Sequence, residues 1–204
     1  MKITMNVWDK LSHKYDSLWV QKYSLTPSRN KILTLIYNKN NDFWLLDIGC
    51  ATGQLLGEIG RKYPKANLLG IDKSQKMIQE ARYKNVNIEF ECAAAEEFNT
   101  DKQFDIITCC HSFPYYLDKP KVLETLASVL KDDGKAIFIQ ASINNFYDKL
   151  VLSVIEQTAE KADYFSRKDF CRLAEKYFVV EGHFTIQEKW FMPSICGFKL
   201  GKKV

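Results

Sequence analysis

The stretch FWLLDIGCATGQLLGEI, from Phe43 to Ile59, decides how the rest of the chain is organised. Its first residues are apolar and lead to Asp47, a pattern typical of a buried strand. A glycine-rich turn with Gly49 and Gly53 follows, and a helical pattern begins at Gln54. This order places free backbone N–H groups and the positive end of a helix dipole beside a loop that a ligand can approach closely. The stretch therefore predicts a site for a nucleotide-like cofactor.

The composition is that of a globular protein. The chain has 204 residues, of which 46% are hydrophobic, and a net charge of +4; these values argue against disorder and do not point to nucleic acid. Apolar runs are only strand-sized and the first residues do not resemble a secretory signal, so we expect neither a membrane span nor secretion. The six cysteines form no CxxC pair. We therefore expect reduced thiols, a cytoplasmic location and no metal site.

Hydrophobic periodicity predicts helices that alternate with strands. Helices are expected at 6–19, 27–37, from 54 onward, and at 74–83, 120–130, 145–162 and 166–177; strands are expected at 43–47, 67–71, 86–92, 104–110, 136–141, 179–187 and 195–200. This alternation is typical of a parallel sheet that is covered on both faces. The link at 188–194 is too short for the helix of a parallel crossover, so the last two strands should be antiparallel.

The length suits one domain over residues 1–204. Within it we expect lid helices in 1–40 and a cofactor-binding core in 41–142. Further helices and a final β-hairpin are expected in 143–204.

The spacing of the glycines distinguishes between cofactors. A dinucleotide fingerprint requires G-x-G-x-x-G, whereas this turn reads G-x-x-x-G with Ala51 between Gly49 and Gly53. Asp47 would repel a pyrophosphate but suits an ammonium group, and the helix start suits a carboxylate. Asp72, which closes the second strand, can accept two hydrogen bonds from ribose hydroxyls. An amino acid joined to a ribose describes S-adenosylmethionine, so a dinucleotide oxidoreductase is disfavoured.

Several segments resemble the motifs of a known family. LLDIGCATGQ is similar to the first motif of class I S-adenosylmethionine-dependent methyltransferases, and GIDKS to the second, whose acid binds the cofactor ribose. AAAEEF, FDIITCCHSFPYYLD and LKDDGKAIFI resemble the motifs that follow. The resemblance covers roughly residues 8–139 and the reversed last strand. It implies methyl transfer and a Rossmann-like three-layer α/β/α sandwich, whose seven-stranded, mostly parallel sheet has an antiparallel last strand.

The resemblance also assigns residues to the cofactor. Ala94 stands where many relatives have an acid for the adenine amine, so adenine is expected on the Ala95 backbone, with Glu96 as a replacement acid. Relatives often place a lid-helix residue over the cofactor, and Tyr15 is the candidate here, although it can equally be a packing residue. The expected cofactor contacts are Tyr15, Asp47, Gly49, Cys50, Ala51, Gly53, Asp72, Lys73, Ala95, Glu96 and His111.

The most individual segment is the loop HSFPYYLD at 111–118, which leaves the fourth strand at the edge where open α/β sheets bind ligands. His111 is a candidate catalytic base because its ordinary pKa suits neutral pH; a backbone contact to the cofactor and a structural role are alternatives. Phe113, Tyr115 and Tyr116 are candidate substrate residues that would form an aromatic wall near the sulfonium or pack the loop against the lid. The acceptor pocket is further expected to involve Trp19, Tyr23, Phe146 and Tyr147.

We therefore expect an S-adenosylmethionine-dependent methyltransferase that acts on a small molecule, as a monomer or homodimer, without nucleic acid or a membrane as partner. SFPY also resembles the N-P-P-Y loop of amino-group nucleic-acid methyltransferases. Ser112 and Phe113 depart from that loop, and the lysines are spread along the chain instead of clustered. A nucleic-acid methyltransferase is nevertheless one alternative, and a non-catalytic S-adenosylmethionine-binding protein is another.

Overall fold

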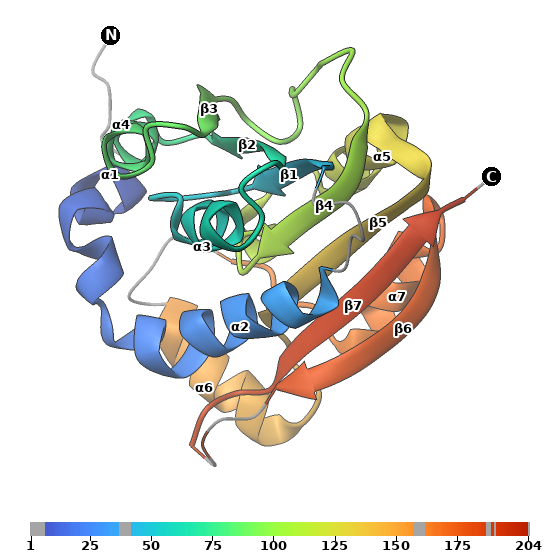
Figure 1. Cartoon of the computed structure of the whole chain (residues 1–204). Coiled ribbons are helices and arrows are strands. Elements are labelled where there is room, and N and C mark those ends of the chain that lie inside the picture. Colours follow the sequence, from blue (N-terminus) through green and yellow to red (C-terminus); the bar gives the residue numbers. More distant parts are fainter. Residues whose placement is uncertain (1–6, 37–41, 157–161, 187–188, 190, 204) are drawn as a thin grey trace, which may run out of the picture.

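The computed structural model describes residues 7–36, 42–156, 162–186, 189 and 191–203. Its centre is a seven-stranded sheet in the order β3-β2-β1-β4-β5-β7-β6, with helices on both faces (Figure 1). The strands are β1 (Trp44–Ile48), β2 (Asn67–Asp72), β3 (Glu89–Cys92), β4 (Phe104–Cys110), β5 (Leu130–Ala141), β6 (Phe178–Ile186) and β7 (Ile195–Lys202).

Helices connect and cover these strands. The α-helices are α1 (Val7–Leu11), α2 (Thr26–Leu35), α3 (Gln54–Lys62), α4 (Gln75–Lys84), α5 (Lys119–Val129), α6 (Phe146–Glu156) and α7 (Arg167–Ala174). Shorter turns are η1 (Ser12–Ser17), η2 (Gln21–Leu25) and η3 (Phe113–Tyr115), where η1 and η3 are 3₁₀-helices and η2 is a π-helix. None of these helices is long and apolar enough to cross a membrane.

The pairing of the strands confirms the predicted architecture. β1 pairs in parallel with β2 and β4, β2 with β3, and β4 with β5. β7 runs antiparallel to both β5 and β6. The carboxyl ends of β1, β2, β3 and β4 therefore meet at one edge of the sheet, which is where such sheets bind ligands.

Two apolar clusters hold the layers together. One lies between the sheet and α5 and α7, with Phe138, Phe170 and Phe198 at its centre. The other lies between the sheet and α2, α3 and α4, and includes Ile32 and Leu56. In Figure 1, α2 and α3 cross in front of the sheet while α5 and α7 lie behind it. The fixed position of α2 against the sheet matters below, because α2 contributes side chains to the site.

The largest departure from the predicted elements is near the start of the chain. The helix expected at 6–19 is an α-helix only to Leu11 and continues as the 3₁₀-helix η1. Ser12 donates a hydrogen bond to the carbonyl of Asp9, and Ser17 donates one to the carbonyl of Lys14. Hydroxyl groups that bond to nearby carbonyls compete with α-helical bonding, which explains the change.

Other boundaries differ by a few residues. β3 begins at Glu89 instead of 86, and β5 begins at Leu130, before the predicted turn. α7 ends at Ala174, before the predicted end at 177. The predicted helix end at Tyr37, the stretch at 157–161 and the strand end at Gln187 lie outside the described residues.

Candidate active site

A cavity of about 330 Å³ opens at the carboxyl edge of the sheet. Its size lies in the range of small-molecule sites. Its walls come from the turns after β1, β2, β3 and β4, from α4, and from α1 and η1, which cover it. The lining residues are Trp8, Tyr15, Gly49, Ala51, Ile71, Asp72, Lys73, Met77, Ala93, Ala94, Ala95, Glu96, Glu97, Cys110, His111, Ser112, Tyr115, Tyr116, Leu117 and Asp118.

The turn after β1 is an unusually tight one. Gly49, Ala51 and Gly53 all have left-handed backbone conformations, with φ of 67°, 48° and 75°. A side-chain carbon at Gly49 would collide with Ser112, so the turn lies directly against the loop after β4. Gly53 precedes α3, and no side chain caps that helix. The first N–H groups of α3 are therefore left for a ligand or water.

Asp72 closes β2 and faces the cavity. Its Oδ2 accepts a hydrogen bond from the N–H of Ala51 at 3.0 Å, and its Oδ1 accepts one from the N–H of Ser74 at 2.8 Å. Burial raises the pKa of Asp72, and these two N–H groups partly oppose that rise. Each carboxylate oxygen has a second lone pair. The carboxylate is thus held in place and can still accept hydrogen bonds from a ligand.

The turn after β3 forms a wall beside Asp72. Ala93, Ala94 and Ala95 line the cavity with small apolar side chains. Glu96 also lines it, and its Oε1 accepts a hydrogen bond from the N–H of Leu117 at 3.0 Å. Glu96 therefore links the turns after β3 and β4.

A smaller hollow of about 30 Å³ adjoins the cavity and shares Tyr15, Gly49, Ala51 and Cys110 with it. Asp47 lines this hollow and is only 2% exposed. The hydroxyl of Thr108 donates to Asp47 Oδ1 at 2.7 Å. Burial raises the pKa of Asp47 to about 7, despite that hydrogen bond. Asp47 therefore has no oppositely charged partner among the described residues, and its carboxylate would be stabilised by a cationic ligand.

Arg29 is a buried cation on the other side of the hollow. Its guanidinium donates to Glu58, Gln21 and Thr26 at 2.9–3.0 Å. Two of its five N–H donors have no partner among the described residues. The sequence interpretation missed Arg29, although one signal was available. Arg29 lies three residues before Ile32 and so shares the inner face of a predicted helix, where a cation is unusual.

The cavity also contains His111, in a constrained conformation. His111 has a φ of 64°, and its backbone N–H donates to the carbonyl of Ile139 at 2.7 Å. Its Nε2 lies 2.8 Å from the hydroxyl oxygen of Ser28 on α2. Burial, with the nearby charge of Arg29, lowers the pKa of His111 to about 4. The ring is therefore neutral at pH 7 and a much weaker base than the sequence suggested.

Aromatic rings cover one side of the cavity. The ring of Trp8 lies 5.1 Å from Tyr115 and 6.5 Å from Tyr15, edge-on in both cases. Tyr116 donates a hydrogen bond to Ser112. Trp8 was not among the residues expected here, although it belongs to the expected lid helix. The contact between Trp8 and Tyr115 joins the lid to the loop after β4, which is the packing role given above as an alternative for Tyr115.

Phe113 was expected with these tyrosines, but the structure places it elsewhere. Its side chain is 1% exposed and packs against Phe138 and Phe170 in the core. The three side chains of the 3₁₀-helix η3 point in different directions, so that Phe113 faces the core while Tyr115 faces the cavity. Phe113 is therefore a core residue and not part of an acceptor wall.

The aromatic residues expected around an acceptor also lie outside the cavity. Trp19 is 58% exposed and Phe146 is 81% exposed. Trp19 follows Leu18, whose extended backbone ends η1 and redirects the chain. Tyr147 donates a hydrogen bond to the carbonyl of Phe191, and the Tyr23 ring lies beside the Phe191 ring. Of the remaining expected cofactor residues, Lys73 lines the cavity, Cys50 lines only the smaller hollow, and Gly53 lines neither.

Polar contacts hold α1 and η1 over the cavity. Ser74 donates to Asp9 at 2.6 Å. Asp16 accepts from Thr52 at 2.6 Å and from Lys84 at 2.8 Å. These contacts join the lid to the turn after β1 and to α4, both of which flank the cavity.

Replacement of Asp16 by alanine should loosen this cover. We expect faster amide hydrogen exchange over residues 8–17, because two of the polar contacts of the lid are lost. Exchange should remain unchanged in the variant Asp132→Ala, which removes an exposed ion pair with Lys202 far from the cavity. Equal exchange over the lid in Asp16→Ala and the unmodified protein would contradict this assignment.

Comparison with known proteins identifies the family of this chain. A family profile described as "Methyltransferase domain" matches residues 45–134. A demethylmenaquinone methyltransferase from Thermotoga maritima is 29% identical over 68% of this chain and 62% of its own length. A tRNA (guanine-N(7)-)-methyltransferase from Prochlorococcus marinus is 30% identical over 62% of this chain and 69% of its own length. The chain belongs to the class I S-adenosylmethionine-dependent methyltransferases, and S-adenosylmethionine is the cofactor of that family.

Solved structures share the fold. A putative methyltransferase solved with the Haloferax volcanii Trm112 activator has a TM-score of 0.83 at 13% identity, over 98% of this chain and 100% of that chain. An S-adenosylmethionine-dependent methyltransferase from Clostridium acetobutylicum has a TM-score of 0.71 at 19% identity, with the same coverage. The chain spans only 62% of the Thermotoga relative and 61% of a malonyl-[acyl-carrier protein] O-methyltransferase from Priestia megaterium, to which it is 25% identical over 78% of its residues.

Proposed function

We propose that this chain catalyses the transfer of a methyl group from S-adenosylmethionine to a small-molecule acceptor. The observation that carries the proposal is the pairing of two acids at adjacent strand ends, the buried Asp47 and the partly buried Asp72. Asp47 lies in a hollow sized for a short charged group, and Asp72 lies in a cavity sized for a nucleoside. This spacing of acids and glycines suits an amino acid joined to a ribose and not a pyrophosphate.

Each part of the cofactor has a complementary group. Asp47 would bind the ammonium group, while Arg29 and the uncapped start of α3 would bind the carboxylate. Asp72 would accept hydrogen bonds from the ribose. Adenine would lie against Ala95, with Glu96 near its amine. The bound cofactor supplies an electrophilic methyl group, so the protein needs mainly to orient the acceptor and exclude water.

The acceptor would enter between the lid and the loop after β4. Tyr115, Tyr116 and His111 line this part of the cavity. By their names, the relatives act on demethylmenaquinone, on malonyl-[acyl-carrier protein] and on a guanine of tRNA. An aromatic cover over one side of the cavity suits a compact acceptor better than a polynucleotide.

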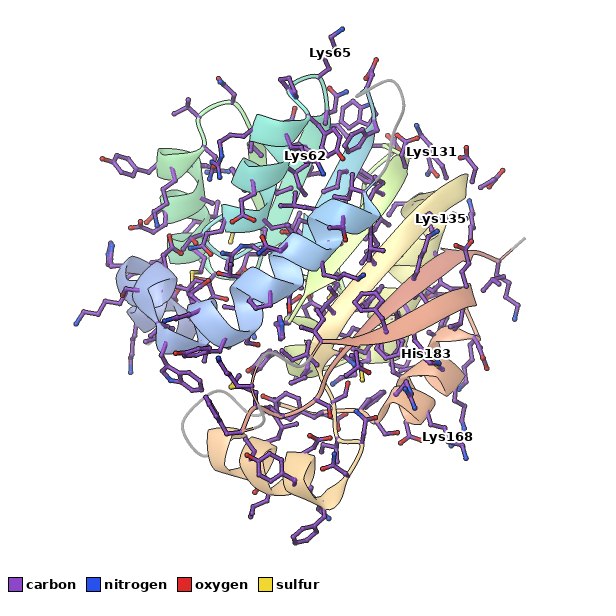
Figure 2. The ribbon with its side chains drawn as sticks, turned by 60° about the horizontal axis from the view of Figure 1, so that its bottom comes forward. Lys62, Lys65, Lys131, Lys135, Lys168 and His183 are labelled. Carbon is purple, nitrogen blue, oxygen red and sulfur yellow. The ribbon has the colours of Figure 1, made fainter. Side chains whose placement is uncertain are left out.

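Two lysines at the far edge of the sheet add no surface for nucleic acid near the cavity. Figure 2 shows Lys131 and Lys135 near the start of β5, at the edge of the sheet opposite the cavity. Lys131 is paired with Asp105, and Lys135 with Glu181. Lysines that are neutralised and lie far from the site are a poor surface for a nucleic-acid backbone.

Incubation with radiolabelled S-adenosylmethionine and a cell extract tests the proposed function. After the extract is separated by size and class, label should appear in a small-molecule product that is distinct from S-adenosylmethionine. Label in the nucleic-acid fraction would support the alternative methyltransferase. Cofactor binding without any transfer would support the non-catalytic alternative. The variant Asp72→Asn, which should bind the cofactor more weakly, provides the control, and its transfer of label should be reduced.

A further inference from the structure

The hydrogen bonds of Ser28 determine which nitrogen of His111 carries a proton. Ser28 Oγ lies 2.8 Å from the carbonyl oxygen of Ser24 and 2.8 Å from His111 Nε2. A carbonyl oxygen can only accept, and a serine hydroxyl has one proton, so Ser28 donates to Ser24. In its contact with His111 Nε2, the Ser28 oxygen must then be the acceptor. The imidazole proton must therefore lie on Nε2.

This arrangement leaves Nδ1 with a lone pair. A neutral imidazole has one donor nitrogen and one acceptor nitrogen, so Nδ1 is the acceptor. His111 lines the cavity, and its Nδ1 has no hydrogen-bond partner among the described residues. The side chain is held from both ends, since Ser28 is fully buried on α2 and the His111 backbone is bonded to Ile139. The site thus presents a fixed acceptor to whatever enters the cavity.

We propose that Ser28 is a positioning residue that keeps His111 in the Nε2–H tautomer, so that Nδ1 accepts a hydrogen bond from an N–H or O–H group of the methyl acceptor. The identity of the ligand rests on the proposed function, whereas the tautomer does not. The cofactor also carries donors: the proposed function assigns its ribose hydroxyls to Asp72 and its adenine amine to Glu96, which leaves its ammonium group. It has a better partner in Asp47, which is a carboxylate and lines the smaller hollow, where His111 is absent.

The proposal narrows the class of acceptor. An amine or a hydroxyl compound can donate to Nδ1, whereas a thioether or a carbon without a nearby N–H or O–H cannot. The low pKa of His111, caused by burial, keeps the ring neutral over the whole physiological range. His111 therefore orients the acceptor by hydrogen bonding, and a full proton transfer to Nδ1 before methylation is disfavoured.

Nitrogen NMR of the imidazoles tests the tautomer directly. The chain has only three histidines, and His13 and His183 are exposed references; Figure 2 shows His183 on β6. At pH 7 the His111 spectrum should show a protonated Nε2 and an unprotonated Nδ1, with no titration above pH 5. The opposite tautomer, or a charged ring at pH 7, would overturn the proposal.

Two variants on α2 test the role of Ser28. In Ser28→Ala, His111 should lose the single Nε2–H tautomer and show a mixture. The matched control is Thr34→Ala, which removes another hydroxyl that bonds to a carbonyl of the same helix but is remote from His111. Ser28→Thr retains a hydroxyl and should restore the wild-type spectrum. An unchanged tautomer in Ser28→Ala would overturn the positioning role, whatever the result for methylation.

S-adenosylhomocysteine separates the two possible donors, because it carries the ammonium group without an acceptor. Its binding, measured by calorimetry, tests the proposed function independently. Binding that leaves the Nδ1 resonance in the unprotonated, free range supports assignment of Nδ1 to the acceptor. A shift of Nδ1 toward the hydrogen-bonded range on binding would overturn that assignment and give Nδ1 to the cofactor.

Discussion

Replacement of Asp72 by asparagine should weaken the binding of S-adenosylhomocysteine roughly 10- to 100-fold. A hydrogen bond to a charged group contributes about 1.5–3 kcal/mol, and tenfold in affinity corresponds to about 1.4 kcal/mol. Asparagine keeps the shape of the side chain but loses the charge and one acceptor. It also leaves the N–H of Ala51 or Ser74 without its acceptor, which loosens the turn that faces the ligand. Calorimetric titration at pH 7.5 measures the effect.

A matched control is available at the other edge of the sheet. Asp105 begins β4, accepts the backbone N–H of Trp44 at 2.8 Å and is paired with Lys131. Asp105→Asn therefore removes a similar strand-end carboxylate without touching the cavity. Its affinity for S-adenosylhomocysteine should stay within about twofold of the unmodified protein. Equal affinities for Asp72→Asn and Asp105→Asn would refute the proposed cofactor site.

Asp47 should make cofactor binding depend on pH. Its pKa is raised to about 7 by burial, and only the ionised form can pair with an ammonium group. Affinity for S-adenosylhomocysteine should therefore fall by about tenfold for each pH unit below the pKa of Asp47. In Asp47→Asn this dependence between pH 5 and 7.5 should disappear, and affinity at pH 7.5 should be low. Titrations at four pH values distinguish the two proteins.

Ionisation of Asp47 favours binding of the cofactor but destabilises the fold when no ligand is bound. Its pKa rises from 3.8 when unfolded to about 7 when folded, so the folded state holds the proton more tightly. The resulting stabilisation is present below pH 3.8 and is lost as the pH rises to about 7. At about 1.4 kcal/mol per pKa unit, the loss is on the order of 4 kcal/mol. Asp47→Asn should thus be more stable than the unmodified protein at pH 8 in denaturant unfolding, and the difference should shrink at pH 4. A lower stability of Asp47→Asn at pH 8 would contradict the buried, unpaired carboxylate.

The core of the fold follows from local sequence signals. β1, β2, β4 and the helices α3, α4 and α5 occur where apolar runs and helical spacing predict them, because each element buries an apolar face. The reversed β7 followed from the length of one link. The lid was less predictable, since the apolar spacing of its first helix did not reveal that Ser12 and Ser17 bond to nearby carbonyls.

Some residues of the site could be predicted from the sequence and others could not. Asp47, Asp72 and Gly49 were predictable because parallel strands bring their carboxyl ends to one edge. Arg29, Ser28 and Trp8 were not, because their places depend on how α2 and α1 pack across the sheet. Phe113 and Phe146 were misplaced since an aromatic residue in a loop or at a helix start gives no indication of which side it faces.

The crowding of Gly49 against Ser112 constrains how sequences related to this one can diverge. A side chain at position 49 would need both a left-handed backbone and the removal of the serine that it meets. Ser112, in turn, donates to the carbonyl of Ile48 and accepts from Tyr116. Single steps at either position therefore disturb both turns at once. Substitution at either position therefore requires a coordinated change at the other. Substrate preference can change more freely through the lid than through the turns after β1 and β4.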